Sequence, residues 1–309
     1  MTCVILLATK NGERFLAQQL DSIKAQSYTQ WTIYASDDGS TDGTRDILLR
    51  YQQQWGRTKL TIYQGPQQGY AQNFWSLIHR VKHKDVKHKD IQYIAFCDQD
   101  DSWDPEHLNR AIVAMRFYNN PCLFGSRTQY IDQDDQLLDF SPEFLKDPCF
   151  QNALVQNIAG GNTQVFNALL LPFLQKIPLG SPIVSHDWMV YQVTTAIGGK
   201  VFYSQHPTVL YRQHAMNLVG RNDRLSDQFR RLLQLLGGRF RHWNSDNLQC
   251  LEFVRNDMTR FHQQVLRRFT KYREQTFIFR LIKVFRLYLF RQTLKGQLGL
   301  YLGYLLKKI

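Results

Sequence analysis

The segment YIAFCDQDD at residues 93–101 joins a short apolar run to three carboxylates within four positions. A short, continuous apolar run such as Tyr93–Cys97 is typical of a strand that is buried on both faces. Carboxylates this close repel one another, and burial is costly for each unless a positive charge neutralises it. A divalent cation bound to a diphosphate would neutralise them, because Mg²⁺ and Mn²⁺ favour carboxylate and phosphate oxygens. The alternative is a solvated acidic turn closed by Trp103–Pro105.

The same succession of apolar runs and amphipathic stretches extends over about the first 130 residues. Such alternation of strands and helices predicts an α/β fold, with βαβ units, a mostly parallel sheet and flanking helices. Ligands of such sheets bind beyond the carboxyl ends of the strands, where the acidic segment would lie. The other expected strands are Val4–Ala8, Thr32–Ala35, Leu60–Tyr63 and Leu123–Gly125, and the expected helices are Phe15–Gln26, Thr44–Gln54, Tyr70–Arg80 and Glu106–Phe117.

Two further strand ends carry polar segments. ATKNGE at residues 8–13 follows the first expected strand, and its small and polar residues leave room for a flat ring to approach the backbone. SDDGSTDGT at residues 36–44 follows the second, where Asp37 and Asp38 can accept hydrogen bonds from a base or a ribose hydroxyl. Each segment taken alone is equally compatible with an ordinary capped turn.

Two segments in the second half of the chain carry residues that suit catalysis or phosphate binding. In SHDW at residues 185–188, Asp187 stands beside Trp188 and is either a helix N-cap or a partly shielded general base. In YRQHAMN at residues 211–217, Arg212 and His214 could reach a metal ion or a phosphate, although a single histidine is weak support by itself.

Taken in order, these segments resemble the family 2 glycosyltransferases of the GT-A fold, a Rossmann-like architecture. Each motif is common on its own, but the ordered set with these spacings is specific. The resemblance covers about residues 1–220. It rests on ATKNGE at 8–13, DDGSTD at 37–42, DQDD at 98–101, HDW at 186–188 and QHAMN at 213–217.

The resemblance implies a nucleotide-sugar donor, a divalent cation as cofactor and a role for each motif. Asp98 and Asp100 would form the metal-binding DXD element, with Asp100 as the direct ligand of Mg²⁺ or Mn²⁺. Asp187 would be the catalytic base, and His214 a further contact to the metal or the diphosphate. The residues implied to line the nucleotide site are Thr9, Asn11, Glu13 and Asp38, with Asp98 beside them.

The HDW and YRQHxxN pair looks most similar to the bacterial rhamnosyltransferase branch, whose donor is dTDP-L-rhamnose. The reaction implied is an inverting single displacement onto a hydroxyl of a lipid-linked cell-surface glycan, with Asp187 taking the proton. Lys10 and the GGN sequence at 160–162 depart from the family pattern. A UDP-hexose-using enzyme of the same fold therefore remains an alternative.

The net charge of +12 is concentrated near the end of the chain. Residues 1–220 hold 19 Lys and Arg against 20 Asp and Glu, whereas residues 221–309 hold 19 against 6. We therefore expect a catalytic domain at 1–221 and a basic helical region at 222–309. Within the first, the nucleotide-sugar half would cover about 1–130 and the acceptor half about 131–221.

The last part of the basic region, 277–309, predicts an amphipathic helix that binds an anionic membrane surface. Its cations fall within about half of a helical wheel among Leu, Phe and Tyr. Two alternatives are a helix packed on the catalytic domain and a homo-oligomer contact through Leu298–Leu306. The cations are Arg280, Lys283, Arg286, Arg291 and Lys295.

Composition favours a cytoplasmic protein on the inner face of the membrane. The five cysteines are scattered without a CxxC pair, no signal-peptide pattern opens the chain, and no run of eighteen apolar residues occurs. The isoelectric point near 9.5 would also permit a nucleic-acid-binding protein. The acidic segment disfavours nucleic acid as a partner, and its intact carboxylates disfavour a catalytically silent subunit.

Overall fold

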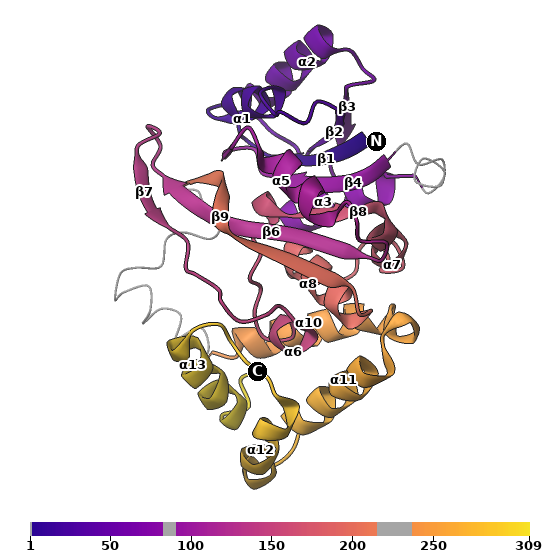
Figure 1. Cartoon of the computed structure of the whole chain (residues 1–309), viewed down its shortest axis with the longest axis vertical. Helices are drawn as coiled ribbons and strands as arrows, with labels where there is room; N and C mark the ends of the chain where they lie inside the picture. Colours follow the sequence, from indigo (N-terminus) through magenta and orange to yellow (C-terminus); the bar gives the residue numbers. More distant parts are fainter. Residues whose placement is uncertain (1, 83–90, 215–236) are drawn as a thin grey trace.

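One nine-stranded sheet organises the residues that the computed structural model describes, which are 2–82, 91–214 and 237–309 (Figure 1). The strands lie in the order β3-β2-β1-β4-β8-β6-β9-β5, and β7 pairs with β6. Their bounds are β1 Thr2–Thr9, β2 Trp31–Asp37, β3 Leu60–Gln64, β4 Ile91–Cys97, β5 Ser102–Trp103, β6 Cys122–Ile131, β7 Leu137–Phe140, β8 Val165–Asn167 and β9 Lys200–Arg212.

The first four strands of this order are parallel, and β1 and β4 among them are buried on both faces. Because side chains alternate along a strand, Val4 and Leu6 of β1 enter one core while Ile5 and Leu7 enter the other. Helices α1 (Leu16–Lys24), α2 (Thr44–Trp55) and α5 (His107–Met115) cover the second core, and α3 (Tyr70–Arg80) covers the first. The predicted α/β class is confirmed, as are the five strands and four helices expected in this part.

The other half of the sheet is mixed. The three-residue strand β8 runs antiparallel to both β4 and β6, whereas β6 and β9 are parallel to each other. The long strand β9 ends at Arg212, and β5 pairs with it directly after the DQDD segment. This pairing brings the chain around residue 212 beside the end of β4.

Short elements precede the helix that carries Asp187. They are α6 (Phe150–Ala153), η1 (Gly161–Thr163), η2 (Ala168–Leu170) and α7 (Leu171–Leu174), and the helix itself is α8 (His186–Ala196). Helix α8 is buried over most of its length and packs in the same core as α3.

The C-terminal helices lie below the sheet in Figure 1, against α6 and α8. Leu251, Phe269 and Tyr304 enter the core that also holds α8, so this region is packed on the catalytic part. The expected boundary at 221/222 lies outside the described residues. The elements are α10 Arg239–Glu252, η3 Arg255–Asp257, α11 Arg260–Arg273, α12 Phe277–Lys283, η4 Val284–Leu287 and α13 Leu294–Leu305.

The prediction of one continuous amphipathic helix over 277–309 is wrong. Helix α12 ends at Lys283, Tyr288 adopts the left-handed conformation at φ 51°, and α13 begins only at Leu294. Arg280 is buried and donates to the Leu305 carbonyl at 2.8 Å, which binds an otherwise unpaired group at the end of α13. The five cations therefore do not share one face. Among the described residues, no helix combines the length and the apolar character needed to cross a membrane.

Candidate active site

The carboxyl ends of β1, β2 and β4 meet at one edge of the sheet. Their parallel register sets Thr9 opposite Asp37 and Leu7 opposite Cys97, so the segments that follow these strands are neighbours. The buried Thr9 hydroxyl donates to the Asp37 carboxylate at 3.1 Å and fixes the first two strand ends to each other.

The expected nucleotide-binding residues tie these loops together. The buried Asp38 carboxylate accepts hydrogen bonds from the backbone of Gln67 and Gly69, at 2.6 and 3.0 Å. The Asn11 side-chain oxygen accepts from the Thr41 backbone at 2.8 Å, and Glu13 accepts from the Gly43 backbone at 2.9 Å. Thr9, Asn11, Glu13 and Asp38 thus gather at one edge and shape it, while direct contact with a nucleotide stays a prediction.

The DQDD carboxylates have unequal surroundings. Burial, followed by the charges of Asp100 and Asp187, raises the pKa of Asp98 to about 8. Asp101 is buried, which raises its pKa, but its oxygens accept from the Asn162 amide at 2.5 Å and the Arg212 backbone at 3.0 Å. Asp101 is therefore a structural anchor, and within the described part of the chain the carboxylate left without such a partner is that of Asp98.

His214 and Arg212, which the sequence suggested as contacts to a metal ion or a phosphate, both contact the DQDD turn; their contact with such a ligand stays a prediction. The His214 Nε2 lies 2.8 Å from an Asp100 carboxylate oxygen, and its ring stacks on Phe15 at 5.4 Å. The buried Arg212 donates through Nε to the Asp100 carbonyl at 2.9 Å and forms an ion pair with Asp135 at 2.8 Å. Arg212 thus fixes the turn while His214 reaches its carboxylate.

The side chains that could ligate a metal here suit an ion that binds together with a phosphate-bearing substrate. Among the described residues no group of three His, Cys, Asp or Glu side chains forms a ready metal site. Asp100 and His214 offer one oxygen and one nitrogen ligand side by side. Mg²⁺ typically uses one or two protein carboxylates, several waters and substrate phosphates, so two protein ligands at this edge are compatible with such an ion.

Asp187 lies in the first turn of α8 with both carboxylate oxygens held. One oxygen accepts from the Asn157 amide at 2.8 Å and the Gly161 backbone at 3.0 Å. The other accepts from the Ser185 hydroxyl and the Trp188 backbone. Its charge contributes to the raised pKa of Asp98, which places the two carboxylates in one electrostatic environment.

The sequence analysis missed several residues around Asp187. Asn157 and Gly161 have no local pattern that marks them, although Gly161 belongs to the GGN segment noted as a departure. A Cβ atom at Gly161 would lie 2.6 Å from the His186 Nε2, so only glycine allows this backbone amide to reach Asp187. Tyr70 was missed as well, and burial together with the charges of Asp187 and Asp98 raises the pKa of its hydroxyl.

The clustered carboxylates and the held Asp187 belong to a sheet whose fold is similar to that of solved glycosyltransferases of the GT-A fold. Residues 4–170 match the family model described as Glycosyl transferase family 2, and the chain belongs to this family. This membership favours an enzyme over a nucleic-acid-binding protein.

Known proteins of similar sequence or fold support this assignment. The chain is 31% identical over 235 residues to the dTDP-rhamnosyl transferase RfbG of Shigella flexneri, covering 73% of this chain and 78% of the relative. Its fold is similar to S. aureus TarS 1–349 in complex with UDP-GlcNAc, with a TM-score of 0.54, 14% identity and coverage of 82% and 72%. It is also similar to the mannosyltransferase PcManGT from Pyrobaculum calidifontis in complex with GDP-Man and Mn²⁺, with a TM-score of 0.51, 14% identity and coverage of 99% and 85%.

We predict that Asp98→Asn stabilises the metal-free protein increasingly as the pH rises toward 8. The folded-state pKa of about 8 exceeds the ordinary 3.8, so between these values the folded state retains a proton that the unfolded chain has lost. Stability therefore falls as the pH rises through this window, and an amide removes that dependence. Thermal unfolding in chelator at pH 5 and pH 8 would show it, with the exposed Asp134→Asn as control. An equal midpoint for variant and parent at both pH values would contradict the burial of this charge.

Proposed function

We propose that this glycosyltransferase transfers L-rhamnose from dTDP-L-rhamnose to a hydroxyl of a lipid-linked cell-surface glycan. The observation that carries the proposal is the Asp187 carboxylate, held by Asn157 and Gly161 next to the Asp98 and Asp100 cluster. This arrangement supplies a fixed base on one side and a site for a diphosphate on the other. The choice of donor is supported by the name of the relative from Shigella flexneri.

In the proposed reaction Asp187 accepts the proton of the acceptor hydroxyl as that oxygen attacks the anomeric carbon. The new carbon–oxygen bond forms while the bond to the nucleoside diphosphate breaks, so one displacement inverts the configuration. The hydrogen bonds from Asn157 and Gly161 fix one carboxylate oxygen, and Ser185 fixes the other. A held base loses little orientational freedom in the transition state.

The donor would bind at the strand ends that carry Asp98 and Asp100, next to Asp187. Asp100 and His214 would hold a divalent cation, Mg²⁺ or Mn²⁺, which when bound offsets negative charge on the leaving diphosphate. Asp98 would add its charge to the same site, and PcManGT, which was solved with GDP-Man and Mn²⁺, supports this choice of ions. The residues proposed to contact the nucleotide are Thr9, Asn11, Glu13 and Asp38.

A UDP-hexose donor is the second candidate. The fold resembles that of TarS in complex with UDP-GlcNAc, so this architecture also accommodates a UDP-sugar. Related sugars differ by a few hydroxyl groups, and a pocket separates them through a small number of hydrogen bonds.

We also propose that the C-terminal helices hold the enzyme on the cytoplasmic face of the membrane. Apolar side chains on α12, η4 and α13 are exposed, and Arg286 and Lys295 are exposed among them. Each cation near an anionic surface contributes about 1 kcal/mol, and inserted apolar side chains add to this. A homo-oligomer contact through the same side chains is the alternative. The exposed apolar residues include Ile278, Ile282, Phe285, Leu294, Leu298 and Leu302.

We predict that Asp187→Asn lowers turnover on the order of 10²- to 10⁴-fold, the usual contribution of a general base. Donor binding should change little, because the amide retains an oxygen for the Gly161 backbone and Asp187 is not a donor ligand in this proposal. Steady-state turnover and donor-induced thermal stabilisation would be measured together, with Asp134→Asn as control. Parent-like turnover would remove Asp187 from the mechanism.

We predict that dTDP-L-rhamnose with Mn²⁺ raises the unfolding temperature more than any UDP-hexose with Mn²⁺, because a tighter ligand stabilises the folded state more at equal concentration. Chelator should abolish most of the shift. Stronger stabilisation and faster turnover with a UDP-hexose would establish the second candidate instead.

We predict that the double variant Ile278→Ser/Ile282→Ser binds anionic vesicles more weakly than the parent. The two side chains are exposed one turn apart on α12, so their replacement removes apolar contact without opening the core. Phe117→Ser, an exposed residue distant in sequence, serves as control. Cosedimentation with phosphatidylglycerol vesicles at low and high salt would measure the effect, since salt screens the cations. If the parent does not bind vesicles and the variant changes its oligomeric state, the exposed side chains form an oligomer contact instead.

A further inference from the structure

An aromatic cluster lies directly beside the proposed base. Trp188 follows Asp187 in α8, and its ring centroid is 6.4 Å from those of both Phe240 and Trp243 in α10. Phe240 and Trp243 are themselves 5.4 Å apart and only partly buried. We call Trp188, Phe240 and Trp243 the aromatic cluster. The indole of Trp188 donates to the Ala153 carbonyl at 2.7 Å, which fixes the cluster on the catalytic part of the molecule.

Two arginines stand over this cluster. The Arg239 guanidinium lies 4.5 Å from the Trp243 ring centroid, and the Arg291 guanidinium lies 5.5 Å from that of Phe240. The pKa of Tyr70 is raised by burial and by the charge of Asp187, and the charge of Arg239 offsets a small part of that rise. Arg239 is therefore within electrostatic reach of the group that also senses the base.

Arg239 differs from its neighbour Arg241 in its commitments. Arg241 pairs with Glu274 at 2.8 Å and donates to the Lys307 carbonyl, so its charge is used within the fold. Among the described residues no carboxylate or carbonyl oxygen accepts from the exposed Arg239 guanidinium. A cation on an aromatic ring beside an active site is suited to bind an anionic group of a ligand.

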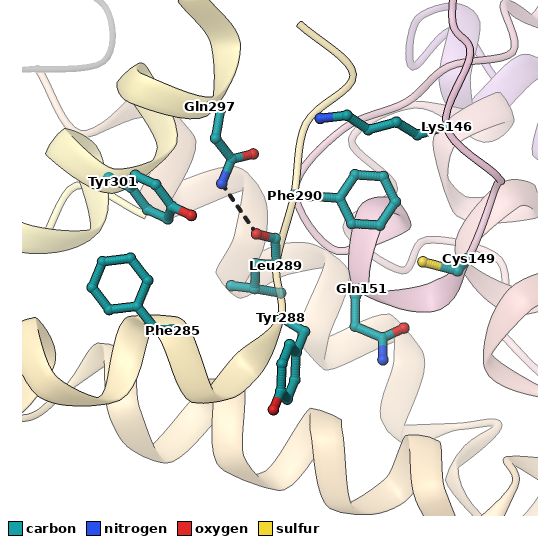
Figure 2. Close-up of a pocket in the computed structure, with 9 residues that line it drawn as sticks. All are labelled: Lys146, Cys149, Gln151, Phe285, Tyr288, Leu289, Phe290, Gln297 and Tyr301. Carbon is teal, nitrogen blue, oxygen red and sulfur yellow. Dashed lines mark hydrogen bonds between the residues drawn. The ribbon is translucent and has the colours of Figure 1, made fainter. Parts of the chain in front are cut away.

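A cavity of about 880 Å³ opens beyond Arg291, between the segment near Lys146 and the C-terminal helices (Figure 2). Rings from Phe285 and Tyr301 flank one side of it and Phe290 the other. Most of this lining is apolar, and the cavity is open to solvent, so it has the size and chemistry for a hydrocarbon chain.

Arg291 connects the cavity to the aromatic cluster. Its guanidinium lies on Phe240, whereas its backbone carbonyl accepts from Lys146 at 2.9 Å and its backbone amide donates to Gln297 at 2.7 Å. Lys146 and Gln297 both line the cavity. Contacts therefore run in succession from Trp188, which follows Asp187 in the chain, through Phe240 and Trp243 and the two cations to residues that line the cavity, and we call this succession the track.

We infer that this track binds the acceptor as a phosphate-linked lipid. The partly buried Phe240 and Trp243 contact the sugar next to the reacting hydroxyl, Arg239 and Arg291 bind the phosphate linkage, and the cavity holds the first part of the hydrocarbon chain. The order of sugar, phosphate and hydrocarbon in such a molecule matches the order of rings, cations and apolar walls along the track. This inference rests on the proposed function, and it assigns the cavity to the acceptor's own chain rather than to a bulk membrane lipid.

The test uses geranylgeranyl diphosphate as probe, with inorganic diphosphate and geranylgeraniol as its separate parts. Binding to the full chain is followed by tryptophan fluorescence in chelator, so that a metal–diphosphate site for the donor does not contribute. The parent should bind the probe at a concentration at least ten-fold lower than either part. Arg239→Gln should weaken the probe about ten-fold, while Arg268→Gln, an exposed cation on α11, should not change it.

The cavity is tested by filling it. Gln151 lines the cavity, and Gln151→Trp should weaken the probe about ten-fold while leaving inorganic diphosphate unchanged. Donor-induced thermal stabilisation shows that each variant is folded. If the parent fails to bind any nucleotide-sugar, the proposed function fails irrespective of the probe.

Three outcomes overturn the inference while the proposed function stands. The first is donor binding without probe binding. The second is equal probe affinity for Arg239→Gln and the parent. The third is a loss of phosphatidylglycerol vesicle binding in Gln151→Trp as large as its loss of probe binding, which would assign the cavity to membrane lipid.

Discussion

Three carboxylates lie close together at the end of the buried strand β4, where their charges repel one another, and the surrounding elements compensate them to different degrees. Asp101 is neutralised within the fold by Asn162 and the backbone of Arg212, so it costs little once folded. Asp100 is reached by His214, which lies on a segment 114 positions later in the chain. Asp98 has no such partner in the described part of the chain, and its pKa is raised. The folded protein is therefore less stable with Asp98 than it would be with a neutral residue at this position. Such a cost is typical of a residue retained for binding or chemistry.

Arg212 holds segments that are far apart in sequence in position around the three carboxylates. Its side chain is fully buried, and it binds the Asp100 carbonyl, Asp135 and the Gln18 side chain at once. Its guanidinium also lies 4.5 Å from the ring of Phe15, on which His214 stacks. One buried cation thus links the first helix, the acidic turn, the β6–β7 region and the end of β9. The antiparallel pairing of β9 with β5 makes this possible, because it places the end of β9 beside the acidic turn.

Sequence periodicity was sufficient to predict most strands and helices of the first half of the fold, because short apolar runs and amphipathic stretches alternate there. Parallel strands then bring their ends together, which is why the clustering of Asp98 with the first two loops could be predicted. Asn157, Gly161 and Tyr70 could not, since each acts across a loop through contacts that no local pattern encodes. The prediction of one continuous C-terminal helix was wrong for a related reason. A helical wheel does not reveal that Tyr288 turns left-handed or that Arg280 is buried against the end of another helix.

The basic C-terminal region differs in composition from the rest of the chain, but it is packed together with the helix that carries the proposed base. Leu251 and Phe269 share a core with Met189 of α8, the helix that begins at the proposed base. Trp188 packs on one side against the catalytic part and on the other against α10. Any displacement of α10 would therefore reach the residue next to Asp187 through direct ring contacts, so the position of the base depends on both regions. The region that carries the excess of positive charge is thus packed directly against the helix that begins at the proposed base.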